Sequence, residues 1–141
     1  MKVRDLMTRD VEVARPEEPI QSVAQRMARG DFGFMPVVDG KRLIGAVTDR
    51  DLAIRAVAGA LPPSTPVGEV MTRDVSFLNE NDDLETVLNK MSGEQIRRLP
   101  IVNDARDLCG VVSIGDMAAK VKERYAGEAL EAISKPAAGH A

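Results

Sequence analysis

An internal duplication is the feature that most constrains the fold of this 141-residue chain. The segment VRDLMTRDV at residues 3–11 recurs as VGEVMTRDV at residues 67–75, an offset of 67 minus 3, or 64 positions. After the prolines of the two repeats the offset becomes 65, since Gly45 corresponds to Gly110. A unit of about 60 residues is marginally stable alone. We therefore expect two repeats that pack on each other about a pseudo-twofold axis.

The chain divides by this comparison into two repeats and a short linker. The stretch GALPPSTP, at residues 59–66, is rich in turn-forming residues and separates the two copies. We expect a first repeat at 1–61, a linker at 62–66, a second repeat at 67–126, and a C-terminal helical extension with a frayed tail at 127–141.

Each repeat has the pattern of an α+β unit with the order β-α-β-β-α. Apolar residues fall at helical spacing from Ile20 and again from Leu84, which predicts an amphipathic helix in each repeat. Strands are predicted where short apolar runs flank turn residues such as Asp39-Gly40. The predicted segments are extended pieces at 11–13 and 75–77, strands at 35–38 and 43–47, and second helices at 49–58 and 114–125.

The motif GAVTDRD at residues 45–51 returns as GVVSIGD at residues 110–116. In both copies a hydroxyl residue stands at the expected start of a helix, three positions before an aspartate. One interpretation is a capping box, which needs no ligand. The other is a phosphate bound by the hydroxyl and the free amides of the helix, with the aspartate accepting hydrogen bonds from a ribose diol. The two are compatible, because a cap can open when a ligand binds.

Composition argues against nucleic-acid and membrane partners. The formal net charge is -3, and three Phe, one Tyr and no Trp leave neither a basic face nor a set of stacking aromatics. No apolar run approaches the roughly 18 residues of a membrane span, and the N-terminus lacks a signal-peptide core. We expect a cytoplasmic protein.

Few residues offer catalytic chemistry. His140 is the only histidine and lies in the predicted tail, so no histidine-based nucleophile arrangement can form within the repeats. Cys109 is the only cysteine, in a predicted strand, where it is interpreted as a small buried apolar residue. Neither a metal-ligand spacing nor a phosphate-binding P-loop is present. We expect no enzyme and no required metal or cofactor.

Taken together, the repeated MT-x-x-V opening, the MPVV and LPIV segments and the closing [ST]-x-x-D resemble a cystathionine β-synthase (CBS) domain pair, also called a Bateman module. The resemblance spans roughly residues 3–125, and small stand-alone bacterial CBS-pair proteins are similar. It implies clefts for adenosine-containing ligands, namely AMP, ADP, ATP or S-adenosylmethionine.

The resemblance also implies which residues line the two clefts. Thr48 and Ser113 match the hydroxyl beside the phosphate, and Asp51 and Asp116 the carboxylate that binds ribose. Apolar residues around the adenine would be Val11, Val13, Met35 and Pro36 in one pocket, and Val75, Phe77, Leu99 and Pro100 in the other. For each of these apolar residues, core packing is the alternative role. Arg50 and Arg98 are candidate phosphate contacts, with exposed solubilising arginines as the equal alternative. The different charges predict unequal affinities.

Two functions remain open at this stage. The first is a regulatory module that senses an adenosine-containing ligand and modulates an unknown partner protein. The second is a dimerisation or scaffold module that has the fold but binds no nucleotide. The resemblance also implies a homodimer. Its candidate interface consists of apolar residues at helical spacing in the second helices: Leu52, Ala56, Val57, Met117, Val121 and Tyr125.

Overall fold

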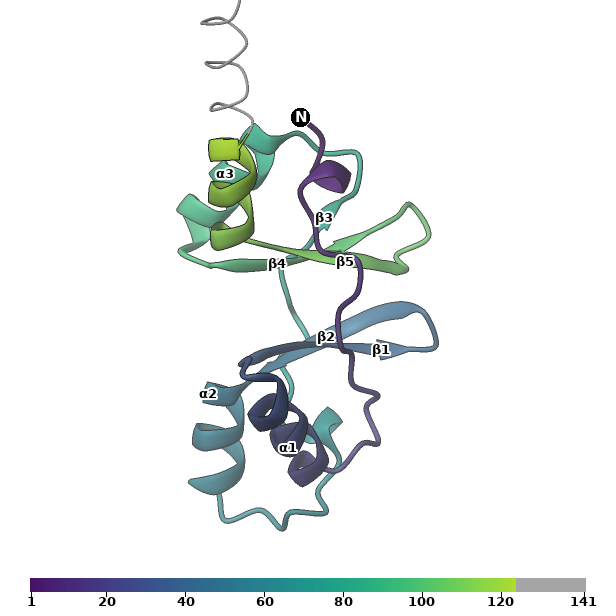
Figure 1. Cartoon of the computed structure of the whole chain (residues 1–141). Helices are drawn as coiled ribbons and strands as arrows, with labels where there is room; N and C mark the ends of the chain where they lie inside the picture. Colours follow the sequence, from purple (N-terminus) through teal and green to yellow (C-terminus); the bar gives the residue numbers. More distant parts are fainter. Residues whose placement is uncertain (124–141) are drawn as a thin grey trace, which may run out of the picture.

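The computed structural model describes residues 1–123. It contains two packed bodies whose sheets face each other at the middle of the molecule, while helices cover the outer sides (Figure 1). The first body contains α1 (Ile20–Gly30), β1 (Phe34–Asp39), β2 (Arg42–Thr48) and α2 (Asp49–Asp51), which continues as the π-helical segment η2 (Leu52–Val57). The second contains β3 (Leu78–Asn79), α3 (Leu84–Glu94), β4 (Arg98–Val102), β5 (Leu108–Ser113) and helical residues 114–123.

These elements confirm the predicted α+β fold of two β-α-β-β-α repeats. The antiparallel hairpins β1-β2 and β4-β5 lie at the predicted strands, and α1 and α3 at the predicted amphipathic helices. Each of these helices ends at a left-handed residue, Asp31 or Gln95. Tyr125 and the expected extension at 127–141 lie outside the described residues.

The prediction of strands at 11–13 and 75–77 was wrong by a few residues. Parallel pairing begins later, as a single bridge between Ala14 and Val37 and as the short strand β3 beside β4. The reason is that residues 9–13 cross from one body to the other. Thr8 is still paired with Val111 in the second body, and Ala14 is the first residue paired in the first body.

The opening segment of each repeat completes the core of the other body. Residues 3–7 pack with the second core, which includes Leu99 and Val112, whereas residues 67–71 pack with the first. Backbone hydrogen bonds of 2.8 Å fix both segments at matching positions, from Val3 N to the Asp82 carbonyl and from Val67 N to the Glu18 carbonyl. Figure 1 shows the N-terminal segment running from the second body across both sheets into the first. Each packed core therefore draws on both repeats.

The glycine of each repeated motif is required by this crossing. At Gly45 an added Cβ would lie 2.6 Å from the carbonyl oxygen of Thr72, and at Gly110 it would lie 2.6 Å from that of Thr8. Each threonine also pairs with the strand through two backbone hydrogen bonds of 2.8 to 3.0 Å. The carbonyl therefore cannot withdraw without breaking the pairing, and only a residue without a side chain fits beneath it.

We expect Gly45→Ala and Gly110→Ala each to lower the free energy of unfolding by about 1–3 kcal/mol, because the new methyl group displaces a paired backbone segment. Urea unfolding followed by circular dichroism measures the change. Gly93→Ala is the matched control, since nothing lies within 4 Å of its added Cβ in α3. It should raise stability by roughly 0.5–1 kcal/mol. Equal effects at all three glycines would contradict the crossing as the cause.

Candidate functional site

The first motif forms a closed capping box at the start of α2. The backbone N–H of Asp51 donates to Thr48 Oγ1 at 3.1 Å, and the N–H of Thr48 donates to Asp51 Oδ2 at 3.0 Å. The other carboxylate oxygen of Asp51 lies 3.9 Å from Nε of Arg55. Both oxygens of this carboxylate therefore already have local partners, as the capping interpretation expects.

The second motif also caps a helix, but its carboxylate contacts a residue outside the motif. Asp116 N donates to Ser113 Oγ at 3.0 Å, which caps helical residues 114–123. The carboxylate oxygen Oδ2 of Asp116 accepts a hydrogen bond of 3.2 Å from the hydroxyl of Thr8, in the opening segment of the first repeat. The carboxylate of Asp116 therefore contacts the opening segment of the other repeat. A hydroxyl group of a ligand could take the place of the Thr8 hydroxyl there.

A cavity of about 360 Å³ lies beside Ser113 and Asp116. It brings together five of the fourteen residues predicted from the resemblance, which are Val11, Pro36, Arg98, Ser113 and Asp116. The lining comes from both repeats: the hydroxyl and carboxylate of the second motif face apolar residues of the first repeat. Sequence reasoning missed six lining residues: Thr8, Asp10, Glu12, Phe32, Phe34 and Val111. Three of them had a signal in the duplication, because Thr8 and Asp10 belong to the repeated MTRDV and Val111 to GVVSIGD.

The other predicted residues lie elsewhere. Met35 and Leu99 are fully buried, one in each core, and Pro100 is buried in β4. Val75 and Phe77 line a separate cavity of about 260 Å³. The remaining four are not among the residues that line the cavity beside Asp116. They are Thr48, Arg50 and Asp51 at the start of α2, and the half-buried Val13.

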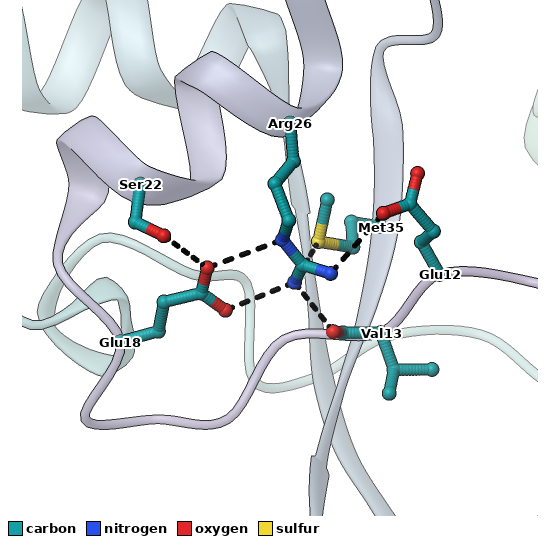
Figure 2. A network of polar contacts seen from close by, with 6 residues as sticks. All are labelled: Glu12, Val13, Glu18, Ser22, Arg26 and Met35. Carbon is teal, nitrogen blue, oxygen red and sulfur yellow. Dashed lines mark hydrogen bonds and ion pairs between the residues drawn. The ribbon is translucent and has the colours of Figure 1, made fainter. Parts of the chain in front are cut away.

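Arg26 of α1 fixes the segment that carries Glu12, one of the residues lining the cavity beside Asp116. Figure 2 shows its polar contacts. Its Nη2 donates to the carbonyl oxygen of Val13 at 2.6 Å and to Glu18 Oε1 at 2.9 Å, and it lies 3.2 Å from the sulfur of Met35. Nη1 forms an ion pair of 3.3 Å with Glu12, which lines the cavity. Since the arginine side chain is 23% exposed, these contacts are partly shielded from water. They fix the segment 12–18 against α1.

The second repeat has no equivalent of this network. Lys90 stands where the first repeat has Arg26, and its ammonium lies 3.2 Å from Glu94 within the same helix. Ser76 Oγ, at the position of Glu12, donates to Glu94 at 2.7 Å. These two hydrogen bonds lower the pKa of Glu94, with Ser76 contributing most. The segment is therefore joined to its helix by a guanidinium fork in the first repeat and by one hydrogen bond, from a serine hydroxyl to a carboxylate, in the second.

Residues 1–123 contain neither a cluster of metal-ligating side chains nor a membrane-spanning helix. That part of the chain gathers no group of three or more His, Cys, Asp or Glu residues able to hold a metal ion. None of its helices is long and apolar enough to cross a membrane.

Comparison with known proteins shows relatives of the same length. The CBS domain YhcV protein of Bacillus subtilis is 41% identical over 133 residues, which is 94% of each chain. Hypoxic response protein 1 of Mycobacterium tuberculosis is 33% identical over 137 residues, or 96% of this chain and 95% of the relative. The crystal structure of Hypoxic Response Protein I with two coordinated zinc ions has a TM-score of 0.77 and covers 84% of this chain and 98% of that chain.

A ligand-bound structure is also similar. The CBS domain pair of protein MJ0100, in complex with 5'-methylthioadenosine and S-adenosyl-L-methionine, has a TM-score of 0.75 at 26% identity. The alignment covers 88% of this chain and 98% of that chain. The family model of the CBS domain matches twice, at residues 3–57 and 67–123. The chain therefore belongs to the CBS domain family and carries two copies of the domain in tandem.

Proposed function

We propose that this chain is a regulatory module that binds an adenosine-containing ligand, AMP, ADP, ATP or S-adenosylmethionine, in the cavity beside Asp116. One observation carries the proposal: the lining of a 360 Å³ cavity brings the carboxylate of Asp116 and the hydroxyl of Ser113, both from the second repeat, together with apolar residues of the first repeat, next to the acidic Asp10 and Glu12. A nucleoside has the same division, with a diol that donates hydrogen bonds and a flat base that packs on apolar groups. The adenosine ligands bound by the CBS pair of MJ0100 support this choice of ligand.

Within this cavity each group has a distinct role. Asp116 accepts hydrogen bonds from the ribose diol in place of the hydroxyl of Thr8. Phe34 and Pro36 pack against the base, as does Val11. Arg98 is exposed at the rim, where its guanidinium can pair with a phosphate. No cofactor is needed for this binding.

The two motifs should differ in affinity for the ligand. At the first motif a ribose must displace the backbone N–H of Thr48 from Asp51, which opens the helix cap. At the second motif it displaces only a side-chain hydroxyl, and the Arg26 network holds the facing wall. Because less must rearrange, the proposal assigns the tighter site to Asp116.

Pairing of two copies fits the outer helix faces. An apolar groove of about 420 Å³ lies between α3 and helical residues 114–123, with Leu88 and Ile114 exposed along it. A second groove of about 210 Å³ lies between α1 and η2, next to Val57, which is 77% exposed. The two grooves occupy related positions in the two repeats, so one copy can present both to a second copy. We propose a homodimer formed in this way, with a regulated protein as a further partner.

The alternative is a dimerisation or scaffold module that binds no nucleotide. The closed capping box of Thr48 and Asp51 favours it, because that motif is satisfied without a ligand. The same outer grooves would then be the functional surface. The next experiment separates the two functions.

Asp116→Ala is expected to weaken binding of the adenosine ligand by more than tenfold, because the ribose loses its charged acceptor. Asp51→Ala is the matched control and should change the affinity of the tighter site less than threefold. Calorimetric titration with AMP, ADP, ATP and S-adenosylmethionine measures both, on protein freed of bound nucleotide. Unchanged affinity in Asp116→Ala would remove the site assignment. Binding of none of the four ligands to the wild type would favour the scaffold function.

The thiol of Cys109 does not have the properties of a catalytic nucleophile. Burial raises its pKa to about 11, and its hydrogen bond of 3.3 Å to the Glu80 carboxylate acts in the same direction. The thiol therefore stays protonated at neutral pH, whereas a nucleophilic cysteine needs a thiolate.

We expect Cys109 to react with iodoacetamide at pH 8 about 100-fold more slowly than a cysteine in a peptide, because its pKa is raised from 9.0 to about 11 and each pKa unit is tenfold in thiolate. The rate should rise as the pH passes 10. Glu80→Gln removes the acceptor charge and should speed the reaction, while urea-unfolded protein should match the peptide. A native rate equal to that of the peptide would contradict the raised pKa.

A further inference from the structure

A second polar cavity, of about 260 Å³, lies where the tips of the two hairpins meet. It shares no lining residue with the cavity beside Asp116. Three arginines line it: Arg42 at the start of β2, Arg73 in the segment that crosses β2, and Arg106 in the turn between β4 and β5. We call this cavity the arginine pocket. None of the residues of the two repeated motifs lines it.

The backbone around the arginine pocket is fixed by hydrogen bonds between the repeats. Leu43 N donates to the Arg106 carbonyl at 3.1 Å, and Leu108 N donates to the Lys41 carbonyl at 2.9 Å, so the two hairpin tips are joined. Arg73 follows Thr72, whose N–H and carbonyl both pair with Ala46. The backbone positions of three arginines from distant parts of the sequence are therefore fixed around one cavity.

Arg106 occupies a conformation that favours glycine. Its φ is 70°, in the left-handed region, and its N–H donates to the Asn103 carbonyl at 3.0 Å. The first hairpin makes its corresponding turn with a glycine, Gly40, at a φ of 62°. The guanidinium of Arg106 lies 4.4 Å from the ring centroid of Phe77, which fixes its plane beside the cavity. An arginine in a conformation that favours glycine indicates that its side chain has a role at this position.

The charge of the arginine pocket is not compensated within the described residues. None of the five ion pairs formed by residues 1–123 includes Arg42, Arg73 or Arg106. Arg73 Nη2 makes only a long contact of 3.4 Å with the carbonyl oxygen of Gly68. Asp74 is the single acidic residue in the lining, so three positive charges face one negative charge. Like charges held together without counterions repel each other, and an anion would relieve the repulsion.

We propose that the arginine pocket binds a small, multiply charged phosphate anion such as pyrophosphate or a phosphomonoester group. Planar guanidinium groups match phosphate oxygens by paired hydrogen bonds, which a single ammonium cannot do. Leu43 and Ile44 line the same cavity, while the three arginines are exposed, so an anion can reach them from solvent. The volume suits a phosphate or pyrophosphate group and does not require a nucleoside.

The pseudo-symmetric position in the molecule carries less positive charge, because an acid and a lysine stand there beside Arg9. By the offset of 65, Asp107 stands where Arg42 would be, and Lys41 stands where Arg106 would be. The substitution of an acid for an arginine lowers the local charge by two. The pocket is therefore single, and the binding stoichiometry is one anion per chain.

Titration calorimetry of the full chain with inorganic pyrophosphate, at low ionic strength, tests the proposal. The wild type should bind one pyrophosphate per chain, and Arg42→Gln combined with Arg106→Gly should weaken binding at least tenfold. Glycine is chosen at 106 because it accepts the positive φ, and Arg42→Gln alone serves if the pair unfolds in urea earlier than the wild type. Lys41→Gln is the matched control, since it removes an exposed charge from the same hairpin tip.

The outcomes are distinct. A loss confined to the Arg42 and Arg106 variants, with full affinity in Lys41→Gln and in Arg98→Gln, supports a separate anion site. An equal loss in Lys41→Gln would mean general charge attraction and would overturn the proposal. So would a loss in Arg98→Gln, because pyrophosphate would then occupy the cavity beside Asp116, which Arg98 lines. Absence of any pyrophosphate binding by the wild type would overturn it as well.

Discussion

The close approach of each opening segment to a strand of the other body is the constraint on which this structure depends. The carbonyl oxygens of Thr8 and Thr72 lie so near β5 and β2 that only Gly110 and Gly45 fit beneath them. This contact carries each segment into the opposite core and brings Thr8 to the carboxylate of Asp116. It also places residues 10–12 along the cavity beside Asp116. The two cores, the crossing segments and the cavity beside Asp116 therefore all depend on this packing contact, which occurs once in each repeat.

Much of the fold could be predicted from the sequence, because helical spacing and hairpin turns are local signals. The two helices from Ile20 and Leu84 and both hairpins lie where these patterns indicate. The crossing could not be predicted, since nothing in VRDLMTRDV shows which core receives Val3 and Leu6. The strand prediction at 11–13 failed for the same reason: apolar Val11 and Val13 alternate with Glu12 as in a strand, but the segment spans two bodies and does not pair. Local pattern does not determine which sheet a segment joins.

The candidate site shows the same limit in chemical terms. The hydroxyl and aspartate were visible in both motifs, yet the sequence could not distinguish the closed cap at Asp51 from the carboxylate of Asp116 that reaches Thr8. The difference arises from neighbours more than a hundred residues away in the chain. The duplicated repeats have also diverged in chemistry, with a guanidinium at Arg26 against an ammonium at Lys90, and with opposite charges at Arg42 and Asp107. Equivalent backbones therefore surround chemically different cavities.

Because each opening segment packs in the core of the other body, neither repeat has a complete core of its own. A single repeat cut from this protein would keep its own hairpin and helices but lack the apolar residues that close its core, which here come from the other copy. Two such fragments could complete each other only by trading segments, as in a domain-swapped dimer. The tandem chain is in effect that dimer joined end to end. Its two bodies therefore fold and unfold as one cooperative unit, although each looks like a small domain in outline.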